Sequence, residues 1–169
     1  VPEIRDNALL PGESAPQMED GSVEFRHVDF SYSKNPNNLN LHDINLRIES
    51  GMTVGILGGT GSAKTTLVQL IPRLYDVTAG QLLVGGHDVR EYRLNDLRTN
   101  VAMGRQNNLL FSGTIEENLR WGNAEATQEE IEQACRAAQA HDFILSFPKG
   151  YQTELGQAGV NVSGGQKQR

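Results

Sequence analysis

Residues 55–66 read GILGGTGSAKTT, and the interpretation of the whole chain starts from this stretch. Gly58, Lys64 and Thr65 match the G-x-x-x-x-G-K-[ST] spacing of a phosphate-binding loop, whose backbone N–H groups converge on an anion. We expect Lys64 to neutralise phosphate charge and the Thr65 hydroxyl to coordinate Mg²⁺. The predicted nucleotide-binding residues here are Gly58, Gly59, Thr60, Gly61, Ser62, Ala63, Lys64, Thr65 and Thr66.

The flanks of the loop supply the context that this pattern requires. The apolar run MTVGIL (52–57) predicts a strand buried on both faces. TTLVQLIPRLY (65–75) has helical spacing, and Pro72 is expected to bend or end that helix. The positive end of the helix would then face a bound anion. The alternative is a glycine-rich turn between strand and helix that holds no ligand.

Ala63 stands where the loop pattern has its second glycine. If this position needs a positive φ, a non-glycine residue costs roughly 1–2 kcal/mol, which is about a tenfold loss in affinity. If the glycine instead lets the backbone approach phosphate, a methyl group clashes, and the site could be abolished. The sequence leaves both alternatives open.

The composition is that of an ordinary globular domain. The chain has 169 residues, 37% of them hydrophobic and 21% charged, and a net charge of −6 that disfavours a broad nucleic-acid surface. Its single cysteine, Cys135, lies in the Ala-rich stretch QACRAAQA, which suggests a small packed residue; a reactive thiol is the alternative. No apolar run approaches the ~18 residues of a spanning helix, and no signal peptide is apparent. The chain itself reads as cytosolic in character, which does not exclude attachment to a membrane protein.

The first half of the chain reads as mixed β and α. Apolar and polar residues alternate over 22–32, with an irregularity near His27, and again over 40–50. QLLVGG (81–86) predicts a third strand, and a short helical segment, RLNDLR, follows. NVAM (100–103) is expected to return to strand.

The pattern is mainly helical from Ser112 onward. TIEENL predicts one short helix. A long helix is expected from Thr127, because Thr127 and Glu130 form a capping box, and Ile131, Ala134, Cys135 and Ala138 share one face. His141 is expected near the end of this helix and exposed to solvent.

VSGGQKQR (162–169) resembles the signature motif of ATP-binding cassette (ABC) proteins. The glycine loop and this motif together form a pair that is highly specific for ABC proteins. The resemblance covers essentially the whole chain from Gly21. LFSGTIEENL (110–119) and TELGQAG (153–159) resemble segments of the exporter branch, the second being its X-loop. The implied fold is α/β, a partial P-loop NTPase (ABC ATPase) fold with an antiparallel β subdomain, a RecA-like core and a helical subdomain.

The resemblance assigns roles to further residues. Tyr32 matches the A-loop aromatic that stacks on adenine. Gln106 matches the Q-loop glutamine, which in the family reaches Mg²⁺ and the attacking water, so it is the catalytic and, with Thr65, the metal-binding candidate. The signature residues Ser163, Gly164, Gly165 and Gln166 open a helix that faces the γ-phosphate held by a second domain.

The implied protein is an exporter that uses ATP and Mg²⁺ as cofactors. Two nucleotide-binding domains, identical or different, would close head to tail around ATP, and hydrolysis would let them part and drive transport. Residues 1–21 read as a linker from a transmembrane domain, 22–105 as the β subdomain and first part of the ATPase core, and 106–169 as the Q-loop, helical subdomain and signature. The expected location is the cytoplasmic face of the cell membrane, as part of an integral membrane transporter.

Several positions depart from the family pattern. Besides Ala63, the pair Gly104-Arg105 stands where the family has an apolar residue or proline, and Gln157-Ala158 replaces the Glu-Arg of the X-loop. The Walker B aspartate, catalytic glutamate, D-loop and switch histidine follow the signature in the family. They do not occur within residues 1–169, so we expect these residues alone not to hydrolyse ATP.

Two other functions remain open from the sequence. A non-transport ABC ATPase would share the loop and the signature, but would be expected to lack LFSGTIEENL and TELGQAG. A regulatory module with a degenerate nucleotide site is favoured by Ala63 and Gly104-Arg105. It is opposed by Lys64, Thr65, Tyr32 and the intact SGGQ of the signature.

Overall fold

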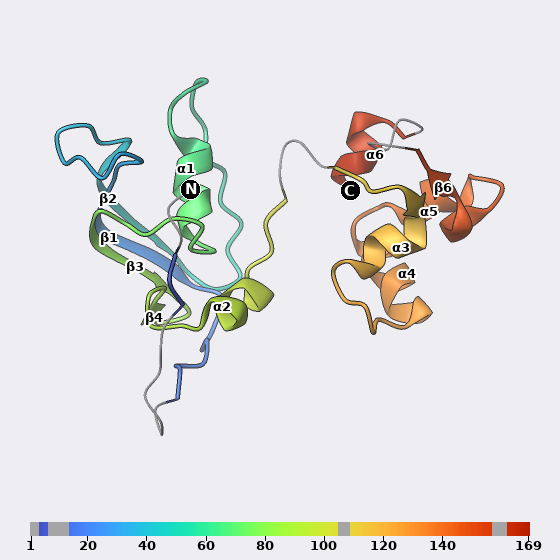
Figure 1. The fold of residues 1–169 in the computed structure, drawn as a ribbon, viewed down its shortest axis with the longest axis horizontal. Helices are drawn as coiled ribbons and strands as arrows, with labels where there is room; N and C mark the ends of the chain where they lie inside the picture. The colour runs from blue at the N-terminus through green and yellow to red at the C-terminus, as the bar shows by residue number, and fades with distance from the viewer. Residues whose placement is uncertain (1–3, 7–13, 105–108, 157–161) are drawn as a thin grey trace. The chain divides into compact units, whose positions relative to one another are not determined.

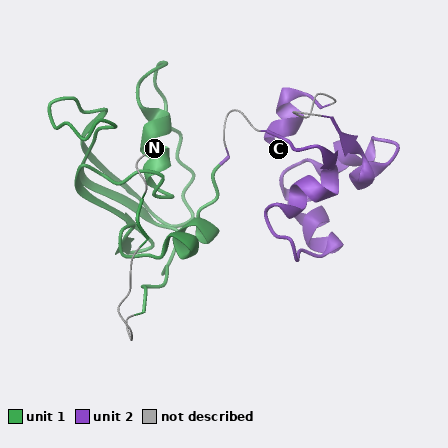
Figure 2. Cartoon of the chain, viewed as in Figure 1, with its two compact units in different colours: residues 1–103 green, residues 104–169 purple. Residues whose placement is uncertain are grey.

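The computed structural model describes residues 4–6, 14–104, 109–156 and 162–169. The chain divides into two compact units, residues 1–103 and 104–169, coloured separately in Figure 2. Each unit has a hydrophobic core of its own.

Unit 1 is built on an antiparallel sheet with the strand order β2-β1-β3-β4 (Figure 1). The strands are β1 (Val23–Phe30), β2 (Leu41–Ile48), β3 (Ala79–Val84) and β4 (His87–Asp88). The three strands expected from alternation and apolar runs are confirmed. Phe25, Val28 and Phe30 of β1 are buried, because their side chains lie on the core face of the sheet.

A bulge in β1 confirms the irregularity expected near His27. His27 has φ +48°, and the pairing with β2 shifts register between Phe25 and Val28. The opposing residue on β3 is Gly80, with φ +80°, where an added Cβ would overlap the carbonyl oxygen of His27. The bulge and the glycine are therefore complementary features of neighbouring strands.

Two short helices complete the core of unit 1. These are α1 (Lys64–Leu70) and α2 (Leu94–Asn100), and Leu70 and Leu97 are fully buried with residues of the sheet. The predicted end of α1 at Pro72 is confirmed, since the helix stops two residues earlier. The predicted short helix around RLNDLR is also confirmed.

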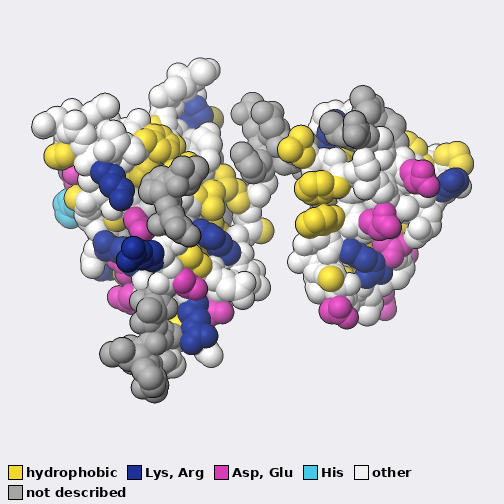
Figure 3. All heavy atoms as spheres, viewed as in Figure 1, with side chains coloured by type: hydrophobic (Ala, Val, Ile, Leu, Met, Phe, Trp, Pro, Cys, Tyr) yellow, Lys and Arg dark blue, Asp and Glu magenta, His cyan; other side chains and the backbone are white. Residues whose placement is uncertain are grey.

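Two predicted strands are absent from the described part of unit 1. Residues 52–57 are irregular and exposed, with the side chain of Leu57 96% exposed, and residues 101–103 are also irregular. A strand buried on both faces needs hydrogen-bonded neighbours along its edges. No strand among the described residues pairs with either segment. In Figure 3, hydrophobic side chains are visible on the surface of both units.

Unit 2 packs short helices around a two-stranded ribbon. The strands β5 (Gly113–Thr114) and β6 (Glu154–Leu155) pair antiparallel. The helical elements are α3 (Ile115–Arg120), α4 (Gln128–Ala137), α5 (His141–Leu145), the 3₁₀ turn η1 (Gly150–Gln152) and α6 (Gly164–Gln168). Thr127 and Glu130 form the predicted capping box at the start of α4, and Ile131 and Cys135 are buried on its inner face.

The long helix expected from Thr127 is interrupted, so that prediction is wrong in its extent. Helix α4 ends at Ala137, Gln139 has φ +57°, and α5 begins at His141. His141 is therefore at the start of a helix and only partly exposed. Its Nδ1 lies 2.8 Å from the hydroxyl of Tyr151, a contact between segments that helical periodicity does not reveal.

Candidate nucleotide-binding site

The glycine loop of unit 1 closes around the side chain of Lys64. The Lys64 ammonium donates to the carbonyl oxygens of Gly58 and Gly59, both at 2.7 Å, and to Oγ of Ser62 at 3.1 Å. The Ser62 hydroxyl also donates to the Gly59 carbonyl, at 2.8 Å. The residues that hold the ammonium are exposed to solvent, so an arriving phosphate can compete for it.

The structure shows that Ala63 has the positive φ named in the first of the two alternatives. Ala63 is the N-cap of α1 and has φ +60° and ψ +18°, which is the left-handed region. Its position therefore requires the backbone conformation that glycine adopts without strain. Ala63 is also half-buried and packs against the core of unit 1.

Gly59 and Gly61 leave the surface of the loop open. A Cβ added to Gly59 or to Gly61 would meet no atom within 4 Å, whereas one on Gly58 would lie 2.6 Å from Oγ of Ser62. Gly61 has φ +82°. Thr60 and Thr65 are exposed beside them. An open backbone surface next to an ammonium and hydroxyl groups fits a triphosphate with its Mg²⁺.

Tyr32 lies against the helix that the loop opens. Its hydroxyl is 3.0 Å from Oγ1 of Thr66 and 3.4 Å from Oε1 of Gln69. Thr66 is buried, while the Tyr32 side chain is 46% exposed. Tyr32, the predicted adenine-stacking residue, therefore contacts α1, the helix that begins at the end of the predicted phosphate loop.

The signature segment lies in unit 2. Ser163 is the N-cap of α6: its hydroxyl accepts from the Gln166 backbone N–H at 3.2 Å, and the Gln166 side chain accepts from the Ser163 N–H at 2.9 Å. Gly164 and Gly165 have no neighbouring atoms within 4 Å of an added Cβ. The predicted helix start is confirmed, and its two glycines face open space.

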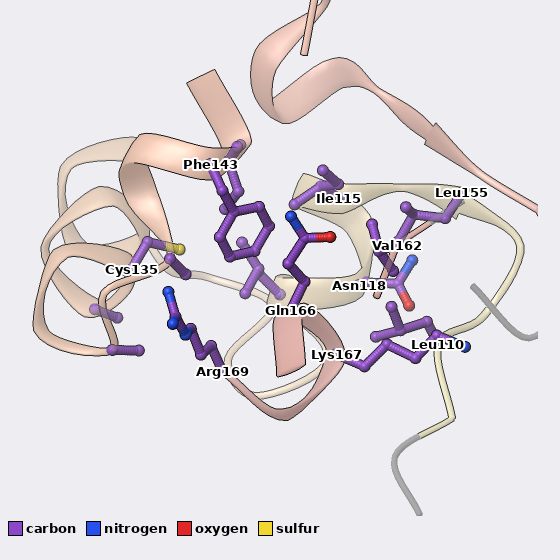
Figure 4. Close-up of a pocket in the computed structure, with 15 residues that line it drawn as sticks. Leu110, Ile115, Asn118, Cys135, Phe143, Leu155, Val162, Gln166, Lys167 and Arg169 are labelled. Carbon is purple, nitrogen blue, oxygen red and sulfur yellow. The ribbon is translucent and has the colours of Figure 1, made fainter. Parts of the chain in front are cut away.

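Helix α6 also borders a cavity of about 260 Å³ in unit 2 (Figure 4). Gln166, Lys167 and Arg169 line it on the α6 side, and Cys135 and Phe143 are among the apolar residues on the other. Arg169 Nη1 donates to the carbonyl oxygen of Gln139 at 2.9 Å, between the two helices α4 and α5. The signature helix thus packs on the core of its own unit through its last residues.

Other predicted features lie outside the described residues. They include Gln106, and Arg105, Gln157 and Ala158 of the departures from the family pattern. Within the described residues, no three His, Cys, Asp or Glu side chains gather as a metal site, and no helix is long and apolar enough to cross a membrane.

Sequence reasoning missed Tyr75, whose ring packs edge to face on Tyr32 with the centroids 5.1 Å apart. It also missed Gln69, the second contact of the Tyr32 hydroxyl. Both residues lie within residues 65–75, whose spacing predicts only a helix that Pro72 bends or ends. The spacing of apolar residues there carried no signal for a contact with Tyr32, more than 30 positions earlier.

Residues 41–169 match the family model described as ABC transporter. A multidrug export ATP-binding/permease protein by name, YgaD of Bacillus subtilis (strain 168), is 52% identical over 149 residues, which are 88% of this chain and 26% of that protein. A similarly named protein of Staphylococcus aureus (strain NCTC 8325 / PS 47) is 46% identical over 153 residues, covering 90% of this chain and 26% of that protein.

A solved structure has the same fold. It is described as a bacterial Atm1-family ABC exporter with ATP bound, and it superposes with a TM-score of 0.84 at 33% identity, covering 96% of this chain and 28% of that one. The chain therefore spans about a quarter of the length of its relatives. The antiparallel sheet, glycine loop and helical unit agree with these matches: the chain belongs to the ABC transporter family, as part of an exporter-type ATP-binding domain with a partial ABC ATPase fold.

Proposed function

We propose that this chain binds Mg·ATP as part of an ABC exporter whose ATP hydrolysis drives transport across a membrane. One observation carries the proposal. The Lys64 ammonium is gathered into a glycine loop that already has the left-handed turn at Ala63, directly before helix α1. This arrangement places a cation and free backbone surface at one point, as phosphate binding requires.

Each site residue has a proposed role. Tyr32 would stack on the base, Lys64 would neutralise phosphate charge, and the Thr65 hydroxyl would take one coordination position of Mg²⁺. Bound Mg²⁺ would supply charge neutralisation at the phosphates. Gln106, by resemblance, would approach the metal and the attacking water.

The signature is proposed to act on a second nucleotide-binding domain. Ser163, Gly164 and Gly165 would face the γ-phosphate held by the glycine loop of that domain, identical or different. The names of the relatives, which combine ATP-binding and permease functions, support a transmembrane domain on the same longer chain. In this assembly the domain would work at the cytoplasmic face of the membrane, with residues 1–21 as the linker.

A titration of the chain with mant-ATP and Mg²⁺ tests nucleotide binding. We expect saturable binding in the micromolar to millimolar range. Lys64→Ala should weaken it about tenfold or more, because the phosphates lose a charge-assisted contact. Lys149→Ala removes the same charge from an exposed position in unit 2 and is the matched control.

Two results would contradict the proposal. One is the absence of saturable binding up to millimolar nucleotide. The other is an equal effect of Lys64→Ala and Lys149→Ala, which would indicate a nonspecific charge interaction. We also propose that residues 1–169 alone release no phosphate from ATP, because the family's general base follows the signature.

A further inference from the structure

Two aromatic rings of unit 1, those of Phe30 and Tyr75, pack on Tyr32. The rings of Phe30 and Tyr32 lie 4.9 Å apart at 82°, those of Tyr32 and Tyr75 lie 5.1 Å apart at 88°, and those of Phe30 and Tyr75 lie 5.7 Å apart at 56°. Phe30 is buried and Tyr75 packs against the core. Both contacts with Tyr32 are edge to face, the geometry that ring quadrupoles favour.

The far end of Tyr32 is also fixed. Its hydroxyl contacts Thr66 Oγ1 at 3.0 Å, and its backbone N–H donates to Oδ1 of Asn40 at 3.2 Å. The ring is therefore held by two neighbouring rings and at its hydroxyl, yet Tyr32 remains 46% exposed. A surface aromatic that is fixed in place and still exposed is suited to receive a flat partner.

Tyr75 itself stands on a braced turn. Arg73 Nε donates to Oδ1 of Asp76 at 2.6 Å, within the turn. From α2, Arg98 donates to the carbonyl oxygens of Pro72 and Arg73, at 3.1 and 2.8 Å. These contacts tie the turn to the core of unit 1, so Tyr75 is a rigid support and not a loosely attached surface side chain.

We propose that Tyr75 is a positioning residue that holds the ring of Tyr32 as the platform for the base of the nucleotide. This inference rests on the proposed nucleotide function and concerns the same site. A ring that is already oriented loses less conformational freedom when the base stacks on it, so binding is tighter. Tyr75 thereby adds to the affinity for the base and not to that for the phosphates.

The test compares two probes, ATP and inorganic tripolyphosphate, each with Mg²⁺ and each competing with mant-ATP. Tyr75→Ala should weaken ATP binding about threefold to tenfold and leave tripolyphosphate binding within about twofold. Tyr75→Phe keeps the ring and should retain the affinity for both probes. Tyr75→Leu keeps an apolar side chain against the core and should behave as Tyr75→Ala, which guards against a loss of folding in the alanine variant.

The outcomes separate this inference from the proposed function. Unchanged ATP affinity in folded Tyr75→Ala and Tyr75→Leu, or an equal loss for both probes, would overturn the positioning role while leaving nucleotide binding intact. Failure of the unsubstituted chain to bind either probe would overturn both. The double variant Tyr32→Ala/Tyr75→Ala should be no weaker than Tyr32→Ala, because Tyr75 acts only through Tyr32.

Discussion

Gly61 and Ala63, two residues apart in the phosphate loop, both adopt the left-handed conformation, with φ +82° and +60°. The first is strain-free and the second is not, because a Cβ in this region crowds the following carbonyl. The loop therefore holds its turn at a cost in free energy that arises at Ala63. Ala63 also packs against the core of unit 1.

Replacing Ala63 with glycine should raise the free energy of unfolding of unit 1 by about 1 kcal/mol. The affinity for ATP should rise by less than about tenfold, since the turn is already formed. Urea denaturation and mant-ATP titration measure the two quantities. A gain in affinity of a hundredfold or more would show that the alanine impairs the natural site, and would favour the degenerate regulatory module.

Gly80→Ala should destabilise unit 1 strongly, by about 3 kcal/mol or more, because the added Cβ overlaps the His27 carbonyl in the bulge. Hydrogen exchange at the amides of β1 and β3 measures the loss. Gly55→Ala is the control, since a Cβ there meets nothing within 4 Å, and it should be neutral or stabilising. Equal protection in both variants would show that the bulge can shift away.

The buried carboxylate of Asp88 predicts a pH dependence of stability. Burial alone would raise the pKa of Asp88, but hydrogen bonds from Arg90, including one of 2.6 Å, outweigh it and lower the pKa. Because the folded pKa is below the unfolded one, this carboxylate stabilises unit 1 above its unfolded pKa of about 3.9. The contribution is lost as the pH falls through the folded pKa.

Asp88→Asn should therefore lower the free energy of unfolding at pH 7 by about 1 kcal/mol, allowing for the exposure of Arg90. The difference from the unsubstituted chain should shrink at acid pH. Denaturation at several pH values follows it. Glu49→Gln, which removes one charge of the exposed pair with Arg47, should have almost no effect. A difference for Asp88→Asn that is the same at every pH would exclude the ionic origin.

Thr127→Ala should cost about 1 kcal/mol of stability in unit 2. The Thr127 hydroxyl caps the Glu130 N–H at 3.3 Å, and Oε2 of Glu130 accepts from the Thr127 N–H at 2.7 Å. Thr127→Ser retains the hydroxyl and should keep the stability of the unsubstituted chain. Circular dichroism during urea denaturation reports the helical content. If serine destabilises as much as alanine, the cap is not the source of the effect.

Cys135 should react slowly with thiol reagents. It is buried, and burial raises the pKa of its thiol, so little thiolate forms near neutral pH. Iodoacetamide at pH 8 should modify the native chain at least about tenfold more slowly than the urea-unfolded chain. Mass spectrometry follows the modification. Similar rates in the two states would support the reactive thiol that the sequence left open.

Local patterns in the sequence were sufficient for the elements that depend on neighbouring residues. The cap at Thr127, the helix end before Pro72 and the helix start at Ser163 each involve groups within a few positions of one another. Such features follow from backbone geometry and local hydrogen bonding, so they depend little on distant parts of the chain. The spacing of Lys64 and Thr65 in the phosphate loop belongs to the same class.

Distant contacts decided the rest. Periodicity in the sequence does not encode the contact of Tyr75 with Tyr32 or that of His141 with Tyr151. It also does not encode the left-handed backbone of Ala63. Residues 52–57 are apolar enough for a strand, yet strand formation depends on a partner elsewhere, and none of the described strands pairs with them. The sequence was sufficient to predict which residue types would bind phosphate at this site. Only the tertiary structure shows that Tyr75 packs on Tyr32, because these side chains come from segments far apart in the chain.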